Sequence, residues 1–183
     1  MKDAADPGAA AGNRSETRAA PCPVITLSDL PMSRQTNAHD AYGASFAAIA
    51  APAGATRLGA RLVEILPGKR AWPLHAHQAN DEMFVILHGR GVLRLGPDEW
   101  VVQAGDVAIC PAGGAGTAHQ LVAGRDGLRY IAISSMHAPD VILYPDSGKI
   151  GIFAGSAPGG DKAKRSIEAI WKLSDAVDYW KDE

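Results

Sequence analysis

Cysteine is scarce in this chain of 183 residues, which contains only Cys22 and Cys110. Two cysteines cannot build the disulfide framework of a small secreted domain. Neither lies in a CxxC pair, which would indicate structural zinc or thiol redox chemistry. The chain therefore fits a reducing compartment, and we expect a cytoplasmic protein.

Basic runs and long apolar segments are also missing. The formal net charge is −2 at pH 7, and no stretch rich in lysine and arginine offers the positive surface that nucleic acids or anionic lipids attract. The N-terminal stretch lacks the apolar segment of a secretory signal, and no later run is long enough to span a membrane. We therefore expect no nucleic-acid partner and no membrane partner.

Hydrophobic residues make up 46% of the chain, which is enough to bury a sizeable core. The length lies within the range of one all-β domain. Composition and pattern divide the chain into four parts. These are a disordered N-terminal tail (1–21), an N-terminal arm with one or two short strands (22–57), a barrel core (58–136), and C-terminal strands and a loop that complete the barrel (137–183).

Short apolar runs separated by Gly, Pro, Asn and Asp fill residues 59–135. This pattern is typical of antiparallel hairpins that close into a barrel or sandwich. LGPDEW indicates a tight turn, HGRGV indicates another, and a glycine-containing connection separates HQLVAG from GLRYIAISS. The sequence therefore predicts an all-β fold.

The run MFVILH is apolar on both faces of its predicted strand. Side chains alternate along a strand, so Phe84 and Ile86 share one face. Met83, Val85 and Leu87 share the other. A strand with two apolar faces is covered on both. The N-terminal arm, the C-terminal segment or a second copy can supply the cover, and a homodimer is the simplest of these.

The segment that begins at Ile167 alternates with a period close to two residues. This period favours a strand over a helix. We predict a strand there, followed by a short turn or helical cap from Ser174 onward.

Three histidines and one glutamate form the most informative group. His75 and His77 are separated by one residue, so on an extended segment both rings point to one side and can reach one ion. Glu82 can return at the start of the next strand as an oxygen ligand, and His119 lies on a later strand. Such a set suits a divalent transition metal (Fe, Mn, Ni, Zn, Co or Cu) and leaves one or two coordination positions open.

Two motifs around these residues resemble those of the cupin family. The first extends from Gly68 through HAHQANDE to Gly89, and the second from Gly105 through CPAG to His119. The resemblance implies a single antiparallel jelly-roll barrel, also called a double-stranded β-helix. It is strongest to small single-domain bacterial cupins labelled sugar-phosphate-isomerase-like. The metal ligands that it implies are His75, His77, Glu82 and His119.

Three departures from the family pattern occur. Six residues rather than five separate Gly68 from His75. The link between Gly113 and His119 carries three extra residues, and Ala123 stands where an asparagine often follows the last histidine. None of these departures removes a ligand.

Four residues are candidates for roles around the metal. Glu82 and Tyr130 are the candidate catalytic groups, because each can carry a proton, and the alternative for Tyr130 is a structural tyrosine at the edge of the barrel. Trp72 is a candidate substrate-binding wall, with packing on the arm as the alternative. Lys149, in YPDSGK, can attract a phosphate as a point charge, although PDSG is also a turn signal.

A cupin barrel hosts many reactions, so the fold does not decide the function. The first hypothesis is a metal-dependent isomerase, of the sugar-phosphate-isomerase type, that acts on a small polar metabolite. The alternatives are an Fe(II)-dependent dioxygenase and a non-catalytic small-molecule binder. Convergence of Arg57, Arg61, Arg94 or Lys149 on the metal would favour a phosphorylated or acidic substrate, whereas an apolar pocket would favour oxidation.

Overall fold

The computed structural model of the protein describes residues 21–35 and 39–183. Except for Pro21, the expected disordered tail lies outside these residues. The strands are β1 (Ser33–Arg34), β2 (Ala44–Ala48), β3 (Gly59–Ile65), β4 (Ala76–His77), β5 (Glu82–Leu95), β6 (Asp98–Gln103), β7 (Val107–Cys110), β8 (His119–Ser134), β9 (Asp140–Tyr144), β10 (Lys149–Ala154) and β11 (Ile167–Lys172).

Helical structure in the described residues is limited to single turns of 3-10 helix. They are η1 (Leu27–Asp29), η2 (Ala115–Thr117), η3 (Pro145–Ser147), η4 (Lys162–Lys164) and η5 (Leu173–Asp175). Within this part of the chain, no helix has the length and apolar character needed to cross a membrane.

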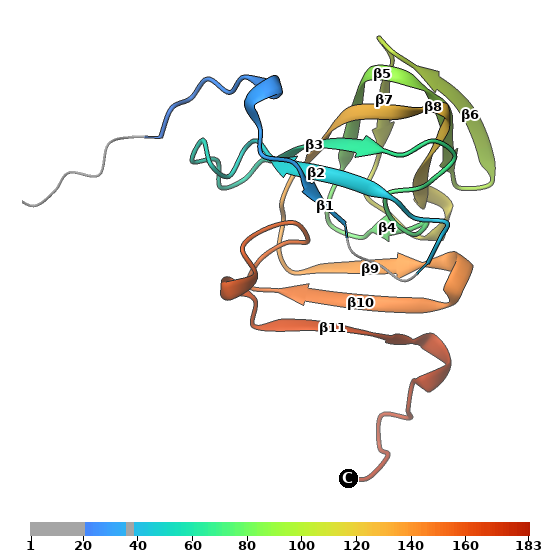
Figure 1. Cartoon of the computed structure of the whole chain (residues 1–183). Coiled ribbons are helices and arrows are strands. Elements are labelled where there is room, and N and C mark those ends of the chain that lie inside the picture. Colours follow the sequence, from blue (N-terminus) through green and yellow to red (C-terminus); the bar gives the residue numbers. More distant parts are fainter. Residues whose placement is uncertain (1–20, 36–38) are drawn as a thin grey trace, which may run out of the picture.

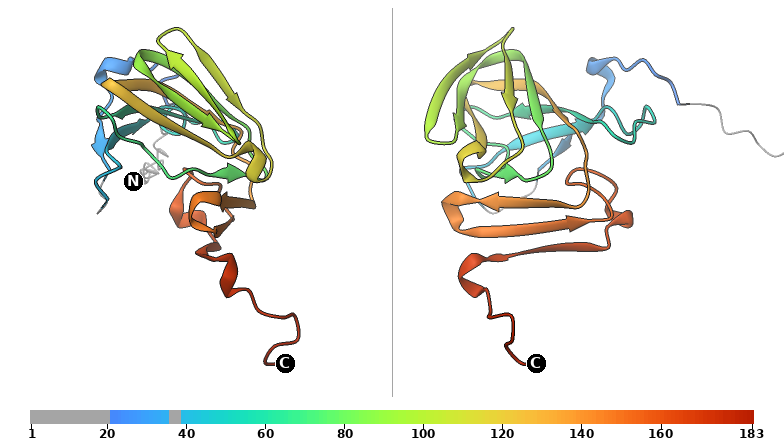
Figure 2. Two further views of the ribbon diagram at one scale, coloured as in Figure 1. Left: turned by 90° about the vertical axis from the view of Figure 1, so that its right-hand side faces the viewer. Right: turned by 180° about the vertical axis from the view of Figure 1, so that it is seen from behind.

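The strands form two antiparallel sheets, and the smaller sheet lies along one side of the larger one (Figure 1). The larger sheet has the order β1-β2-β3-β8-β5-β6, with β7 also paired to β5. The smaller sheet has the order β11-β10-β9-β4. The two turned views show the same arrangement, with β9 to β11 forming one side of the molecule (Figure 2). This is the antiparallel jelly-roll barrel that the resemblance to cupins implies.

Strands β5 and β8 continue through two places where the sequence indicates a break. HGRGV lies inside β5, and the connection after HQLVAG lies inside β8, so both of these predictions were wrong. The pairing of β5 with β8 shifts register on either side of Gly89. A Cβ atom at Gly89 would clash with the carbonyl oxygen of Gly127. Glycine therefore allows two irregular strands to approach closely here, instead of reversing the chain.

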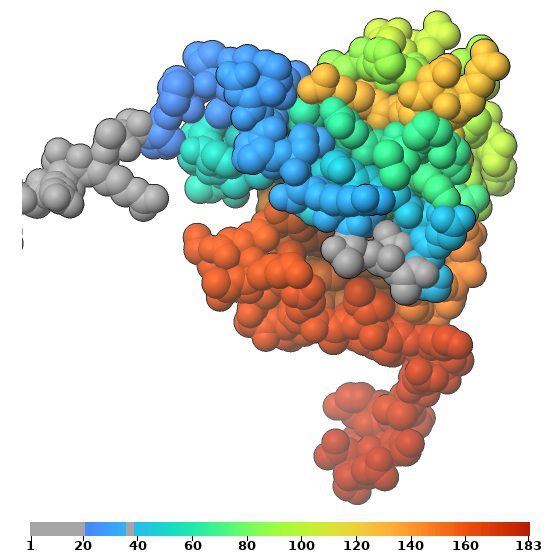
Figure 3. Space-filling model, in the orientation of Figure 1, coloured from blue at the N-terminus to red at the C-terminus, as the bar shows by residue number. Residues whose placement is uncertain are grey.

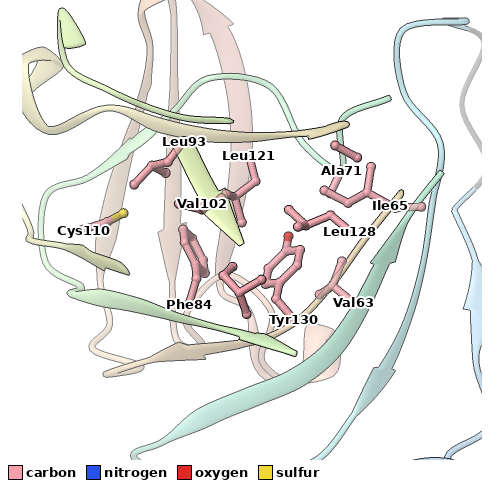
Figure 4. Close-up of a cluster of buried hydrophobic side chains, with 13 residues drawn as sticks. Val63, Ile65, Ala71, Phe84, Leu93, Val102, Cys110, Leu121, Leu128 and Tyr130 are labelled. Carbon is pink, nitrogen blue, oxygen red and sulfur yellow. The ribbon is translucent and has the colours of Figure 1, made fainter. Parts of the chain in front are cut away.

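The main hydrophobic core lies between the strands of the barrel (Figure 4). Phe84 and Ile86, which share one face of β5, are 6% and 1% exposed. Val63 from β3 and Tyr130 from β8 are also buried in this cluster. Burial of these apolar side chains is the main favourable contribution to folding.

The opposite face of β5 is only partly covered. Met83 and Val85 are half-buried, and Leu87 is 37% exposed. Their partners on β7 are more open, since Val107 beside Val85 and Ile109 beside Met83 are each 57% exposed. Neither the N-terminal arm nor the C-terminal segment, as far as the structure describes them, removes this surface from solvent.

The C-terminal segment follows the prediction. Strand β11 spans Ile167–Lys172 and pairs with β10, and η5 then begins at Leu173. All six residues of β11, the edge strand of the smaller sheet, are exposed. Beyond η5 the chain extends away from the barrel (Figure 3).

Candidate metal centre

The three histidines of the predicted site lie close together. His77 ends β4, and His75 forms an isolated antiparallel bridge with His119, the first residue of β8. The ring centroid of His75 lies 5.0 Å from that of His77 and 4.8 Å from that of His119. Backbone pairing between separate segments therefore sets the spacing of the imidazoles.

Glu82, at the start of β5, directs its carboxylate at these rings. Its Oε2 atom lies 3.0 Å from Nε2 of His119, and its Oε1 atom lies 3.8 Å from Nε2 of His77. One ligand atom each from His75, His77 and Glu82 all lie within 4.8 Å of one another. The structure thus contains a His-His-Glu group that can hold a metal ion, with His119 beside it.

Each of the three histidines has a protein acceptor at Nδ1. For His75 it is the carbonyl oxygen of Pro73 at 2.8 Å, and for His119 the carbonyl oxygen of Thr117 at 3.2 Å. For His77 it is the Asp140 carboxylate at 2.6 Å. An acceptor at Nδ1 keeps the ring proton there and leaves the lone pair on Nε2 for a metal.

This tautomer has a consequence for the contact between His119 and Glu82. Both Nε2 of His119 and Oε2 of Glu82 are then acceptors, only 3.0 Å apart. Two acceptors at this distance repel unless a cation, either a proton or a metal ion, neutralises them. Three Nε2 atoms and one carboxylate are also a donor set that first-row transition metals accept. The residues present therefore fit a divalent transition metal.

Asp140 is a site residue that the sequence analysis missed. It is fully buried at the start of β9, where it also accepts hydrogen bonds from the Ala79 amide at 3.0 Å and the Asn80 side chain at 2.9 Å. Burial acts to raise the pKa of Asp140, but the hydrogen bonds from His77 and Asn80 outweigh it and lower that pKa. The only signal in the sequence is an aspartate before the apolar run VILY, which is equally typical of a strand end.

Burial and charge set the protonation states within the cluster. Burial acts to raise the pKa of Glu82, but a hydrogen bond from the protonated ring of His119 and the positive charges of His77 and His75 in their protonated forms lower it to about 2. Burial lowers the pKa of His75 to about 4, and the charge of His119 adds to the effect. At neutral pH Glu82 is therefore a carboxylate and His75 is neutral, which are the forms that bind metal ions.

The cluster opens into a cavity of about 1330 Å³, and the other predicted site residues lie in its wall. Trp72 packs at the edge of the core, and Tyr130 is 1% exposed. Lys149 begins β10, with its ammonium group 5.4 Å from the ring centroid of Tyr144. The cavity therefore brings Trp72, Tyr130 and Lys149 toward the histidines, while their roles stay predictions.

The arginines considered from the sequence divide into two groups. Arg94 pairs with Asp146 in the PDSG turn at 2.9 Å, and Arg57 is exposed outside the cavity wall. Arg61, on β3, lines the cavity.

The prediction that PDSG forms a turn is correct, since η3 occupies it and Gly148 follows in the left-handed conformation.

Comparison with known proteins identifies the architecture. Residues 61–134 match the family model of the cupin domain, and this range contains all four predicted ligands. The chain has a cupin domain. No protein of curated function matches the chain in sequence.

Several solved structures share this fold. A sugar phosphate isomerase of the cupin superfamily from Silicibacter pomeroyi is 19% identical, with a TM-score of 0.68 over 84% of this chain and 95% of that chain. A cupin-2 domain protein from Rhodospirillum rubrum is 18% identical, with a TM-score of 0.52 over 61% and 73%. A polyketide cyclase from Streptomyces resistomycificus is 21% identical, with a TM-score of 0.51 over 64% and 82%. These similarities establish the fold.

The extended link in the second cupin motif has a defined structure. The link contains η2 (Ala115–Thr117), and the amide of Gly113 donates a hydrogen bond to the carbonyl oxygen of His77 at 2.8 Å. Thr117 closes the link with a side-chain hydrogen bond to the Gly114 carbonyl at 3.0 Å. The insertion is therefore tied to the first motif and leaves His119 beside His75.

Proposed function

We propose that this cupin is a metal-dependent enzyme acting on a small polar metabolite, with the isomerisation of a sugar phosphate as the leading candidate reaction. The observation that carries the proposal is the position of the His-His-Glu group. It opens into a cavity whose wall includes the basic side chains of Arg61 and Lys149. Such a cavity suits a ligand that is acidic or phosphorylated.

The proposed ligands are His75, His77, Glu82 and His119. A divalent transition metal bound by them would act as a Lewis acid, polarising a substrate carbonyl and making the neighbouring C–H group more acidic. Tyr130 retains its proton at neutral pH, because burial and then the negative charge of Glu82 raise its pKa. Its hydroxyl is therefore suited to donate to a substrate oxygen, while the ionised Glu82 is the candidate acceptor of the substrate proton.

The dioxygenase alternative has the same metal ligands but predicts an apolar cavity. A cavity wall with Arg61 and Lys149 favours a charged substrate over the apolar one that this alternative predicts. A non-catalytic binder would have the same cavity without turnover. The three functions differ in what happens to the ligand after it binds.

Deuterium exchange separates these functions. Metal-loaded protein is incubated in D2O with a panel of aldose and ketose phosphates, and proton NMR follows both conversion and the loss of the C–H signal next to the carbonyl. We expect conversion with exchange in the wild type, loss of both in Glu82→Gln, and retention in Glu99→Gln, which alters an exposed carboxylate on β6. Absence of exchange, with oxygen uptake after Fe(II) loading, would favour the dioxygenase; binding without either would favour the binder.

We also propose that two copies associate through the open face of β5 and β7. Met83 and Val85 are half-buried there, and Val107 and Ile109 are each 57% exposed. A contiguous apolar surface of this kind is typical of a contact between subunits. Light scattering after size-exclusion chromatography should give a dimer mass for the wild type and a monomer mass for Val107→Asp. A monomeric wild type at micromolar concentration would contradict this proposal.

A further inference from the structure

Arg61 holds its guanidinium group against two aromatic rings in the wall of the cavity. The Cζ atom lies 5.6 Å from the ring centroid of Phe46, on β2, and 5.7 Å from that of Trp72. The two rings are themselves 6.3 Å apart, so the guanidinium contacts both. Aromatic faces stabilise a cation and restrict its rotamers, and they leave its N–H groups free to bind a ligand.

Apart from the two aromatic rings, the guanidinium of Arg61 has no ion-pair or hydrogen-bond partner among residues 21–35 and 39–183. No carboxylate there forms an ion pair with it, and no acceptor there forms a hydrogen bond to it. The other arginine of the cavity wall behaves differently, since Arg165 pairs with Glu168 at 2.6 Å. Arg61 thus presents five N–H donors and a charge that the protein does not satisfy.

Partial burial makes this arrangement costly without a ligand. Burial lowers the pKa of Arg61, and the negative charge of Glu82 acts in the opposite direction. A guanidinium nevertheless remains protonated at any pH at which the protein is folded, so the charge stays. An unpaired cation in a partly desolvated wall is stabilised strongly by an anion that supplies two oxygen acceptors.

The charge of the rest of the wall also favours an anion. Its basic residues are Arg61, Lys149, Lys164 and Arg165, and its acidic residues are Glu82 and Asp161. Glu82 belongs to the proposed metal site, and Asp161 accepts a hydrogen bond from the Ala163 amide at 3.0 Å. Because Arg165 is paired with Glu168, three basic side chains (Arg61, Lys149 and Lys164) and two acidic ones remain in the wall, so its net charge is positive.

The loop after β10 closes against the same group. Gly159 has a φ of +80°, and a Cβ atom at this position would clash with Nη2 of Arg61. Because Gly159 has no side chain, its backbone can lie close to the guanidinium. Gly159 also adds no acidic group that could pair with Arg61. The ligand-binding end of Arg61 is thus confined by Phe46, Trp72 and this loop.

We propose that Arg61 anchors an oxyanion, a carboxylate or a phosphate group, of the ligand that occupies the cavity of the histidine cluster. The identification of that ligand as the substrate rests on the proposed function. Anion binding by Arg61 itself does not, because the positive charge and the free donors belong to the protein. Bidentate hydrogen bonding to the planar guanidinium then positions the remainder of the ligand toward Glu82 and the histidines.

Calorimetric titrations with two anions test this assignment. Inorganic phosphate and acetate are titrated separately into the full-length wild type, Arg61→Gln and Arg57→Gln. We expect at least one anion to bind the wild type and Arg57→Gln, with affinity at least about tenfold lower in Arg61→Gln. Preference for phosphate or for acetate identifies the group. Equal affinity in wild type and folded Arg61→Gln, or no binding of either anion to the wild type, would overturn the proposal.

A second measurement on the wild type avoids dependence on the folding of Arg61→Gln. Phenylglyoxal modifies accessible arginines, and peptide mass spectrometry reports the rate at each position. The bound anion should slow modification of Arg61 severalfold and leave the exposed Arg57 unaffected, whereas equal rates at Arg61 with and without both anions would refute the assignment. Metal content and deuterium exchange are measured on the same samples, so failure of the isomerase proposal is seen separately from failure of anion binding.

Discussion

His75 and His119 are joined by two backbone hydrogen bonds, from the His75 amide to the His119 carbonyl at 3.2 Å and in the reverse direction at 2.8 Å. This bridge places their rings 4.8 Å apart, although the two residues lie in different sequence motifs. Backbone pairing holds them in place independently of any ligand. The protein therefore preorganises the donors of the proposed metal site before an ion binds.

Asp140→Asn should weaken metal binding. The Asp140 carboxylate accepts from Nδ1 of His77 at 2.6 Å, and an amide can instead donate to that nitrogen and shift the ring proton to Nε2. Loss of such a partner typically lowers metal affinity about 10–100-fold. Competition with a chromophoric chelator measures the affinity, with Asp98→Asn, at an exposed position of β6, as the matched control. Unchanged affinity in a folded Asp140→Asn protein would show that Asp140 has no part in metal binding.

Acidification should destabilise the metal-free protein in two overlapping ranges. The pKa of His75 is lowered to about 4, so the unfolded state takes up its proton first as the pH falls below about 6.5. The pKa of Glu82 is lowered to about 2, and its contribution to stability is lost between about pH 4.5 and pH 2. Urea unfolding at pH 7, 5.5 and 4 should show the free energy of unfolding falling by an amount on the order of 1–3 kcal/mol.

His75→Gln provides the check on this pH dependence. The variant should flatten the curve between pH 6.5 and pH 4, whereas His88→Gln, at an exposed position of β5, should leave it as in the wild type. An unaltered slope in His75→Gln would mean that other groups produce the acid sensitivity.

Tyr130→Phe should show whether Tyr130 donates a proton to the substrate or only packs in the core. The ring contacts Phe84 at a centroid distance of 5.5 Å in the core, and the hydroxyl has no hydrogen-bond partner among the described residues. Removing the oxygen should therefore change the melting temperature little. If the hydroxyl donates to substrate, kcat should fall about 10²-fold or more with metal content unchanged. Tyr179→Phe, at a position 82% exposed, is the control. An unchanged kcat in Tyr130→Phe would show that Tyr130 only packs in the core.

The candidate ligands could be predicted because local geometry and a family motif support them. Alternation along an extended segment brings His75 and His77 to one side, and Glu82 follows at the start of the next strand. The place of His119 depends on a bridge between distant segments, so only the resemblance to cupins indicated it. The same resemblance supplied the jelly-roll topology, which strand patterns alone do not distinguish from other all-β folds.

Asp140 was missed by the sequence analysis, and Arg61 could not be singled out from the four basic residues considered there. Asp140 reaches His77 because β9 pairs with β4, and no local feature of either segment indicates that pairing. Arg61 faces the cavity because of the register between β3 and β8. The neighbouring Leu62 and Val63 are both fully buried, so alternation does not reveal which face of β3 points inward.

The two chain breaks predicted wrongly, at HGRGV and after HQLVAG, have a related cause. Glycine is a signal both for chain reversal and for close approach of two backbones. At Gly89 the deciding contact is the carbonyl oxygen of Gly127, which lies on a different strand. The local sequence contains no information about that neighbour, and the strand therefore continued where a turn was predicted.

Elemental analysis of the purified full-length protein tests the central claim most directly. Mass spectrometric metal quantification is applied to the wild type, His77→Ala, His119→Ala and the control His88→Ala. We predict about one equivalent of a divalent transition metal in the wild type and the control, and its loss in the other two variants. A wild type that stays metal-free after supplementation with Fe, Mn, Ni, Zn, Co and Cu, or a full equivalent retained by both His77→Ala and His119→Ala, would contradict the assignment of this cluster as a metal centre.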